Sequence, residues 1–165
     1  MTSDERKPLI AQFNDGYRVV AEAVAGATDA ELDARPAPGK WTAREVVHHL
    51  ADSEMTAAVR LRLLVATDNP EIVGYDQDQF ARALYYDRPI AASLDAFKAA
   101  RRSSGEILER MTDADWARAV GTHTEHGAYT ADRWLEIYAG HAHAHAEQIL
   151  VARAAARDGK NREDR

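Results

Sequence analysis

The chain has 165 residues, seven histidines and no cysteine, and its 21 basic and 27 acidic side chains give a formal net charge of −6. A chain of this length is most simply one domain, and it can bury a sufficient core without a covalent crosslink. The lack of cysteine excludes disulfides, cysteine-ligated metal sites and a cysteine nucleophile within the chain. The acidic balance argues against a nucleic-acid partner, because proteins that bind phosphate backbones carry clustered lysine and arginine.

The sequence shows no signal for export or membrane insertion. Its first residues are charged and then amphipathic, without the apolar core of a signal peptide. The longest weakly polar stretch, residues 21–27, is interrupted by Glu22 and is far shorter than the roughly 20 apolar residues that a bilayer requires. We therefore expect a cytoplasmic protein that contacts no membrane.

Apolar residues recur at helical spacing in four long segments, and period-two alternation is nearly absent, which predicts an all-α domain. The four helices are expected at about residues 4–26, 42–66, 91–111 and 130–157. The second has the clearest start, because Trp41 precedes a capping box formed by Thr42 and Glu45. We expect a single four-helix bundle over residues 1–157, followed by a frayed, charged tail over residues 158–165.

Long connections join the helices. A second capping box, at Thr28, predicts a short helical turn between the first two helices. The connection over residues 67–90 contains a chain-breaking Asp-Asn-Pro sequence and an expected short helix at 77–84. Before the last helix, a capped turn begins at Thr112, and residues 121–127 are expected to form a small hairpin. A connection as long as 67–90 is often functional.

The histidines of the last helix separate by face when the helix is projected at about 100° per residue. His141 and His145 fall on one arc with Tyr138 and Gln148, whereas His143 lies about 200° from His141. Side chains at i and i+4 are neighbours one turn apart, so two imidazoles at this spacing can bind one metal ion. The same spacing also suits histidines that merely hydrogen-bond in a core, so both interpretations stay open.

The helix over residues 42–66 offers a third nitrogen. His49 falls about 60° from Val46 on the apolar stripe, whereas His48 falls about 160° the other way, so His49 is predicted to face the interior. Three histidines would leave coordination positions open, which favours chemistry over a structural role. Ala142 stands where zinc proteases carry the glutamate of His-Glu-x-x-His, which disfavours peptide hydrolysis by that route.

Two blocks of the chain resemble the DinB/YfiT-like metalloenzyme family. Residues 41–54 read Trp-Thr-Ala-Arg-Glu-Val-Val-His-His-Leu-Ala-Asp-Ser-Glu, and residues 138–149 read Tyr-Ala-Gly-His-Ala-His-Ala-His-Ala-Glu-Gln-Ile. The likeness extends over about residues 15–155 and implies a DinB/YfiT-like four-helix bundle, often a homodimer. It also implies one divalent metal ion, zinc or nickel, on His49, His141 and His145. Ala144 departs from the family, whose last block often has further histidines between the two ligands.

The resemblance implies two kinds of activity on a small-molecule substrate. One is metal-dependent hydrolysis, and the other is transfer or isomerisation with a low-molecular-weight thiol such as bacillithiol or mycothiol. Because the chain has no cysteine, that thiol would be a cosubstrate, and the missing zinc-protease glutamate favours S-transfer. The alternative is a non-catalytic metal-binding module for stress response or sensing.

Other residues are secondary candidates for the site. Asp52, Glu45 and Glu147 are spaced to meet imidazole N–H groups or to relay protons, although carboxylates so placed are commonly solvated. Candidates for substrate contact are Tyr75, His123 and Arg101. For Arg101, on the core seam of its helix, pairing with an acidic neighbour is the alternative.

Overall fold

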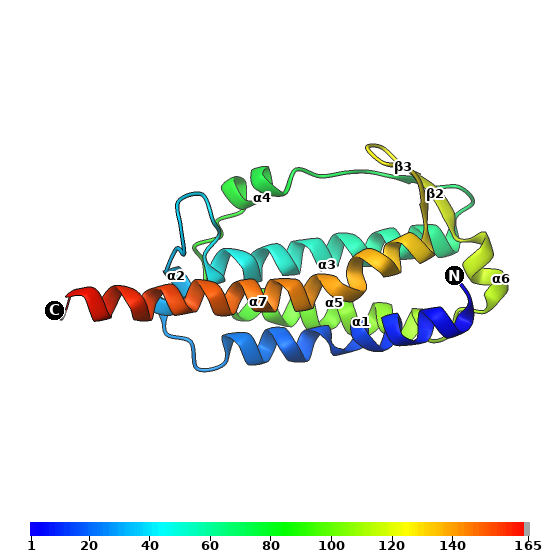
Figure 1. Cartoon of the computed structure of the whole chain (residues 1–165). Coiled ribbons are helices and arrows are strands. Elements are labelled where there is room, and N and C mark those ends of the chain that lie inside the picture. The colour runs from blue at the N-terminus through cyan, green and yellow to red at the C-terminus, as the bar shows by residue number, and fades with distance from the viewer. Residues whose placement is uncertain (164–165) are drawn as a thin grey trace.

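In the computed structural model, four long helices lie side by side as a bundle (Figure 1), and the backbone is described for residues 1–163 and the side chains for residues 1–156. The long helices are α1 (Ser3–Val24), α3 (Ala43–Ala66), α5 (Ala91–Leu108) and α7 (Ala131–Glu163). The predicted helical bundle is therefore confirmed. The last helix continues beyond its expected end at residue 157, so residues 158–163 are helical, and the end of the expected tail, residues 164–165, lies outside the described residues.

Short helices cap the two ends of the bundle. They are α2 (Asp29–Asp33) and α6 (Asp113–Arg118), and each begins at a threonine whose side chain accepts a backbone N–H three residues on. A capping box also begins α3, where the Thr42 hydroxyl accepts the Glu45 N–H at 3.2 Å and the Glu45 carboxylate accepts the Thr42 N–H at 2.7 Å. These reciprocal bonds satisfy backbone donors that the helix itself leaves unpaired.

The connection over residues 67–90 determines the topology. It carries β1 (Glu71–Ile72) and α4 (Gln77–Ala83), and it returns along the outside of the bundle from the end of α3 to the opposite end (Figure 1). As a result α3 and α5 run in the same direction, antiparallel to α1 and α7. The short helix expected at 77–84 is confirmed as α4, which Asp76 caps.

A small sheet closes one end of the bundle. The expected hairpin is present as β2 (Val120–His123) and β3 (Gly127–Thr130), and β1 adds to it in parallel, with Ile72 opposite His123. A Cβ on Gly121 would lie 2.6 Å from the Pro70 carbonyl oxygen, so a glycine allows this close approach. The sheet thereby joins the long connection to the hairpin.

Two apolar clusters fill the bundle. The cluster near the sheet includes Phe13, Leu61, Leu64, Leu108, Trp134 and Leu135. The cluster near α2 includes Val20, Val46, Leu50, Phe97 and Ile149. In the part of the chain that the structure describes, no helix combines the length and hydropathy that crossing a membrane requires.

Candidate metal centre

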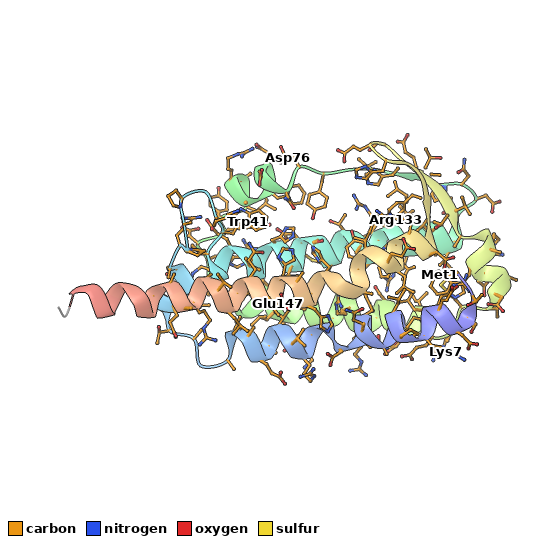
Figure 2. All side chains as sticks on the ribbon, in the orientation of Figure 1. Met1, Lys7, Trp41, Asp76, Arg133 and Glu147 are labelled. Carbon is orange, nitrogen blue, oxygen red and sulfur yellow. The ribbon has the colours of Figure 1, made fainter. Side chains whose placement is uncertain are left out.

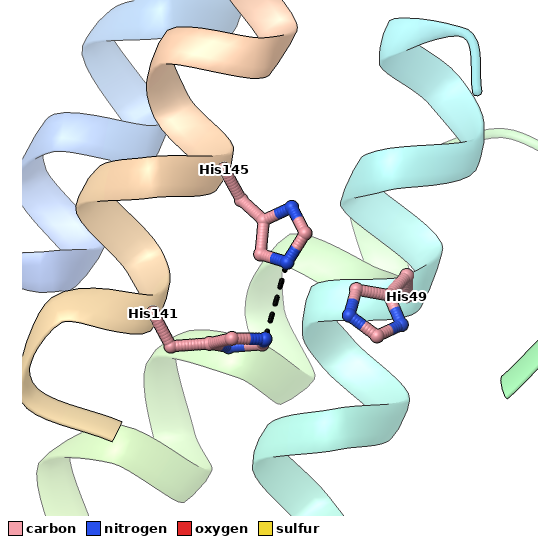
Figure 3. A group of neighbouring side chains, drawn as sticks. All are labelled: His49, His141 and His145. Carbon is pink, nitrogen blue, oxygen red and sulfur yellow. Dashed lines mark hydrogen bonds between the residues drawn. The ribbon is translucent and has the colours of Figure 1, made fainter. Parts of the chain in front are cut away.

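Three histidines converge between α3 and α7. His49 projects from α3, and His141 and His145 project from α7 toward it (Figure 3). Each ring offers a nitrogen, and these nitrogens all lie within 4.8 Å of one another. The imidazole ring centroids of His49 and His145 are 4.8 Å apart, and those of His49 and His141 are 5.4 Å apart. The structure thus brings together the three residues that helical projection selected.

The separation of the ring nitrogens fits a metal ion. The Nε2 atoms of His141 and His145 are 3.1 Å apart, close to the roughly 3.3 Å expected between two nitrogens bound to one tetrahedral zinc. The buried Nδ1 atoms of His49 and His141 have no hydrogen-bond partner. An ion bound at Nε2 of His141 would not satisfy the Nδ1 of the same ring, so the fit to a metal ion rests on the spacing of the Nε2 atoms.

Neighbouring side chains orient two of the rings. The Gln148 Oε1 accepts a hydrogen bond from Nδ1 of His145 at 2.8 Å, which places the ring hydrogen on Nδ1 and leaves the Nε2 lone pair free. The indole of Trp41 packs on the His49 ring with centroids 4.8 Å apart. Helical projection had placed Gln148 on the correct face, but nothing in the sequence showed that it would hold a histidine tautomer.

Burial keeps all three imidazoles neutral. It lowers the pKa of His49 to about 4, with a smaller contribution from His145. It lowers the pKa of His141 to about 2, and the charges on His145, His49 and Arg101 act in the same direction. The pKa of His145 is also lowered by burial, partly offset by the hydrogen bond to Gln148. At neutral pH the rings are therefore in the form that binds metal ions.

The three carboxylates considered as partners lie elsewhere. Asp52 accepts a 2.7 Å hydrogen bond from the Tyr86 hydroxyl. Glu45 caps α3 and pairs with Arg35 at 2.8 Å. Glu147 is exposed on α7 (Figure 2). Among the described residues, no carboxylate hydrogen-bonds any ring of the triad.

The other two helical histidines have different surroundings. Helical projection predicts that His48 faces away from the interior. In the structure it is fully buried, because the long connection covers that side of α3. Its Nδ1 lies 2.8 Å from the Ser93 hydroxyl and its Nε2 lies 2.9 Å from the Arg88 carbonyl. His143 faces α1, where its Nε2 lies 3.3 Å from an Asp15 carboxylate oxygen.

Arg101 forms a buried ion pair next to the triad. It is 1 % exposed, and its Nη2 lies 2.8 Å from a carboxylate oxygen of Glu54, which is completely buried. Its guanidinium also donates to the carbonyl oxygens of Phe13 at 2.6 Å and Tyr138 at 3.1 Å. Arg101 therefore pairs with an acidic neighbour, which was the alternative to substrate contact. Glu54 was not singled out in the sequence, because one acidic residue in an amphipathic helix gives no signal of its partner.

A second group of potential ligands lies on the hairpin. His123, Glu125 and His126 offer ligand atoms within 4.8 Å of one another. However, Nδ1 of His123 accepts the Glu125 N–H at 3.1 Å, so the neutral ring carries its hydrogen on Nε2. That tautomer has no free lone pair for a metal ion. His123 and Tyr75, both considered for substrate contact, line one cavity of about 220 Å³.

The fold and this group of histidines define a class: helical bundles with a three-histidine centre between two helices. The DinB superfamily matches residues 12–149, and the chain therefore belongs to this family.

Several known proteins are similar to this chain in sequence, and a solved structure is similar in fold. A "putative metal-dependent hydrolase" of Oceanobacillus iheyensis is 33 % identical over 140 residues, which cover 85 % of this chain and 81 % of the relative. YfiT of Bacillus subtilis, named in the same way, is 30 % identical over 90 % of this chain and 84 % of its own length. The solved structure of YfiT, described as a probable metal-dependent hydrolase with an unusual four-helix bundle topology, superposes with a TM-score of 0.85. It is 26 % identical over 92 % of this chain and 87 % of that chain.

Proposed function

We propose that the protein is a divalent-metal-dependent hydrolase of a small substrate, with His49, His141 and His145 as the metal ligands. The observation that carries this proposal is the convergence of three neutral imidazoles from two helices. The names of the relatives from O. iheyensis and B. subtilis support the hydrolytic class. Zinc and nickel are the candidate ions, because imidazole nitrogen suits both.

The chain's own residues would prepare the site for this chemistry. A bound divalent ion would act as a Lewis acid and lower the pKa of coordinated water to about 7. Neutral imidazoles leave the charge of such an ion undiminished. Gln148 holds His145 with its Nε2 free, and Trp41 restricts the ring of His49. His141 and His145 are half-buried, whereas His49 is 3 % exposed.

A second candidate is S-transfer from a low-molecular-weight thiol. Two observations favour it: no carboxylate among the described residues contacts the triad, and Ala142 occupies the position of the zinc-protease base. A thiol loses its proton more readily than water, so it depends less on a protein base when a metal ion is present. The absence of cysteine requires that such a thiol come as a cosubstrate.

Metal content tests the ligand set. Protein purified without a histidine tag should hold about one equivalent of divalent metal by elemental analysis. His49→Ala should reduce this stoichiometry strongly, whereas His143→Ala, on the same helix as two of the ligands but facing Asp15, should leave it unchanged. The ligand set is wrong if the unmodified chain takes up no metal or if His49→Ala binds as well as the parent.

Competition between nucleophiles tests the reaction. A panel of esters and amides would be offered to the metal-loaded protein with water alone and with bacillithiol, mycothiol or glutathione. Metal-dependent turnover without thiol supports hydrolysis, and turnover only with thiol, with a thioester product and release of the alcohol or amine, supports S-transfer. Absence of both, together with a closed four-coordinate metal by X-ray absorption, would support the non-catalytic module instead.

A further inference from the structure

A cavity of about 220 Å³ lies between the hairpin, the long connection and the two helices that carry the triad. Its lining includes Arg60 of α3, Tyr75 of the connection, His123 and Tyr129 of the hairpin, and Tyr138 of α7. Every one of these side chains can donate a hydrogen bond, and only arginine among them carries a permanent charge.

Arg60 differs from the other buried arginines of the described chain. Arg6, Arg44, Arg101 and Arg153 each lie within 4.0 Å of a carboxylate oxygen. Arg60 is 9 % exposed, and its hydrogen-bond partners are neutral: the Val73 carbonyl at 2.6 Å and the Tyr138 hydroxyl at 3.3 Å. Its buried Nε has no partner. A buried guanidinium without a counter-charge is costly, and an anion in the cavity would neutralise it.

The neighbouring hydroxyls are also free to donate. Tyr129 is 3 % exposed, and its buried hydroxyl has no hydrogen-bond partner. Burial raises the pKa of Tyr129, which therefore keeps its proton at any physiological pH. The Tyr138 hydroxyl accepts from Arg60, which leaves its own hydrogen to donate. His123 carries its ring hydrogen on Nε2, because Nδ1 accepts the Glu125 N–H. The set suits an acceptor-only group such as a carboxylate or phosphate.

The cavity adjoins the triad. Tyr138, which lines the cavity, also contacts the ring of His141, and their centroids are 5.9 Å apart. One aromatic side chain thus separates the Arg60 guanidinium from the nearest histidine of the candidate metal centre.

We propose that this cavity is an oxyanion-binding subsite, in which Arg60 and Tyr129 hold a carboxylate or phosphate group of the substrate. The substrate class is then a small anionic molecule whose reacting group meets the triad while its anionic group is held by Arg60. The assignment to a substrate rests on the proposed function, whereas binding of the oxyanion itself requires no metal.

Glu125 limits the affinity of the cavity for an oxyanion. Its carboxylate is exposed and lies at the edge of the cavity, against Gly74, where a Cβ would meet the carboxyl carbon at 2.5 Å. A negative charge at this position repels an incoming anion. Removing it should therefore strengthen oxyanion binding, while removing the charge of Arg60 should weaken it.

Calorimetric titration of the full chain with sodium phosphate and, separately, sodium acetate tests the proposal. Arg60→Gln should weaken binding by about tenfold or more, as expected for loss of hydrogen bonds from a charged donor. Arg62→Gln is the matched control, because Arg62 is on the same helix but exposed and bonded to Ser103. Tyr129→Phe, which removes only a hydroxyl, should weaken binding several-fold, and Glu125→Gln should strengthen it.

The outcomes separate this inference from the proposed function. Arg60-dependent binding of phosphate, acetate or both supports the subsite and identifies its oxyanion. Equal binding by the parent, Arg60→Gln and Tyr129→Phe, or no binding of either anion, overturns it. Binding lost in His49→Ala but kept in Arg60→Gln would place the anion on the metal, which overturns the subsite and supports the metal centre. If Arg60→Gln does not fold, the Tyr129→Phe and Glu125→Gln titrations decide.

Discussion

The neutral state of the buried histidines links stability to pH. An imidazole with an ordinary pKa of 6.5 gains a proton in the unfolded chain below that pH, whereas His49 and His141, with pKa values of about 4 and about 2, stay neutral when folded. Because the folded pKa is depressed, the stabilisation is complete above pH 6.5 and is lost as the pH falls.

We therefore expect metal-free protein to lose stability between pH 8 and pH 5, by about 2 kcal/mol for each imidazole that stays neutral in the folded state. Urea unfolding at several pH values measures the slope of the free energy of unfolding against pH. His141→Gln should flatten it, whereas His126→Gln, at an exposed position on the hairpin, should not. Identical slopes for the parent and His141→Gln would contradict the expectation.

The Glu54–Arg101 pair gives a second prediction. Glu54→Met leaves a guanidinium buried without a counter-charge, so it should lower the free energy of unfolding by about 3–5 kcal/mol. The double variant Glu54→Met/Arg101→Met removes both charges and should be more stable than either Glu54→Met or Arg101→Met alone. Chemical denaturation of the three proteins checks this order, and additive losses in the double variant would contradict it.

These residues also show what a sequence can reveal of a site. Face and spacing selected His49, His141 and His145, because a single helix fixes the relative direction of its own side chains. The same projection was wrong for His48, since it assumes one buried face, whereas α3 is covered by the bundle on one side and by the long connection on the other. Partners from distant segments, such as Arg101 for Glu54, depend on the tertiary fold.

Among the helices, α1 has one position where the neighbouring helices come unusually close. A Cβ on Gly16 would lie 2.1 Å from Nη1 of Arg101 and 2.7 Å from the Cβ of Ala142. The arginine cannot easily move away, because it is bonded to Glu54 and to the Phe13 carbonyl. Gly16 thus allows α1 to pack against both α5 and α7.

Gly16→Ala should destabilise the protein by about 1–3 kcal/mol through overpacking, although alanine is the better helix former by about 1 kcal/mol. Gly140→Ala is the matched control, because its Cβ would meet only Gln12 Nε2, at 3.9 Å. That variant should be neutral or slightly stabilising. Thermal unfolding of both distinguishes close packing from helix propensity, and equal effects would argue against the close approach at Gly16.

The secondary structure was predictable where it is periodic or capped. Four long helices, α4 and the hairpin follow from apolar spacing, capping residues and turn residues. The two-residue strand β1 was not predicted, because two residues show no alternation and their pairing with β2 requires the tertiary fold. The parallel direction of α3 and α5 also depends on the course of residues 67–90, whose length permits several paths.

In the whole bundle the triad joins two segments that are far apart in the chain. His49 is near the start of α3, and His141 and His145 are in α7, so a metal ion bound by all three would crosslink the two helices. A ligand that binds only the folded state stabilises it by mass action, by about 2.7 kcal/mol at one hundred times its dissociation constant.

Zinc or nickel in that excess should therefore raise the midpoint of thermal unfolding by about 5–10 °C, and a chelator should reverse the shift. His49→Ala removes the α3 side of the crosslink and should lose most of the shift, whereas His143→Ala should keep it, since its ring faces Asp15. Differential scanning calorimetry measures all three proteins. An equal shift in the parent and in His49→Ala would show that the ion binds to α7 alone or on the surface, and that it does not tie the two helices together.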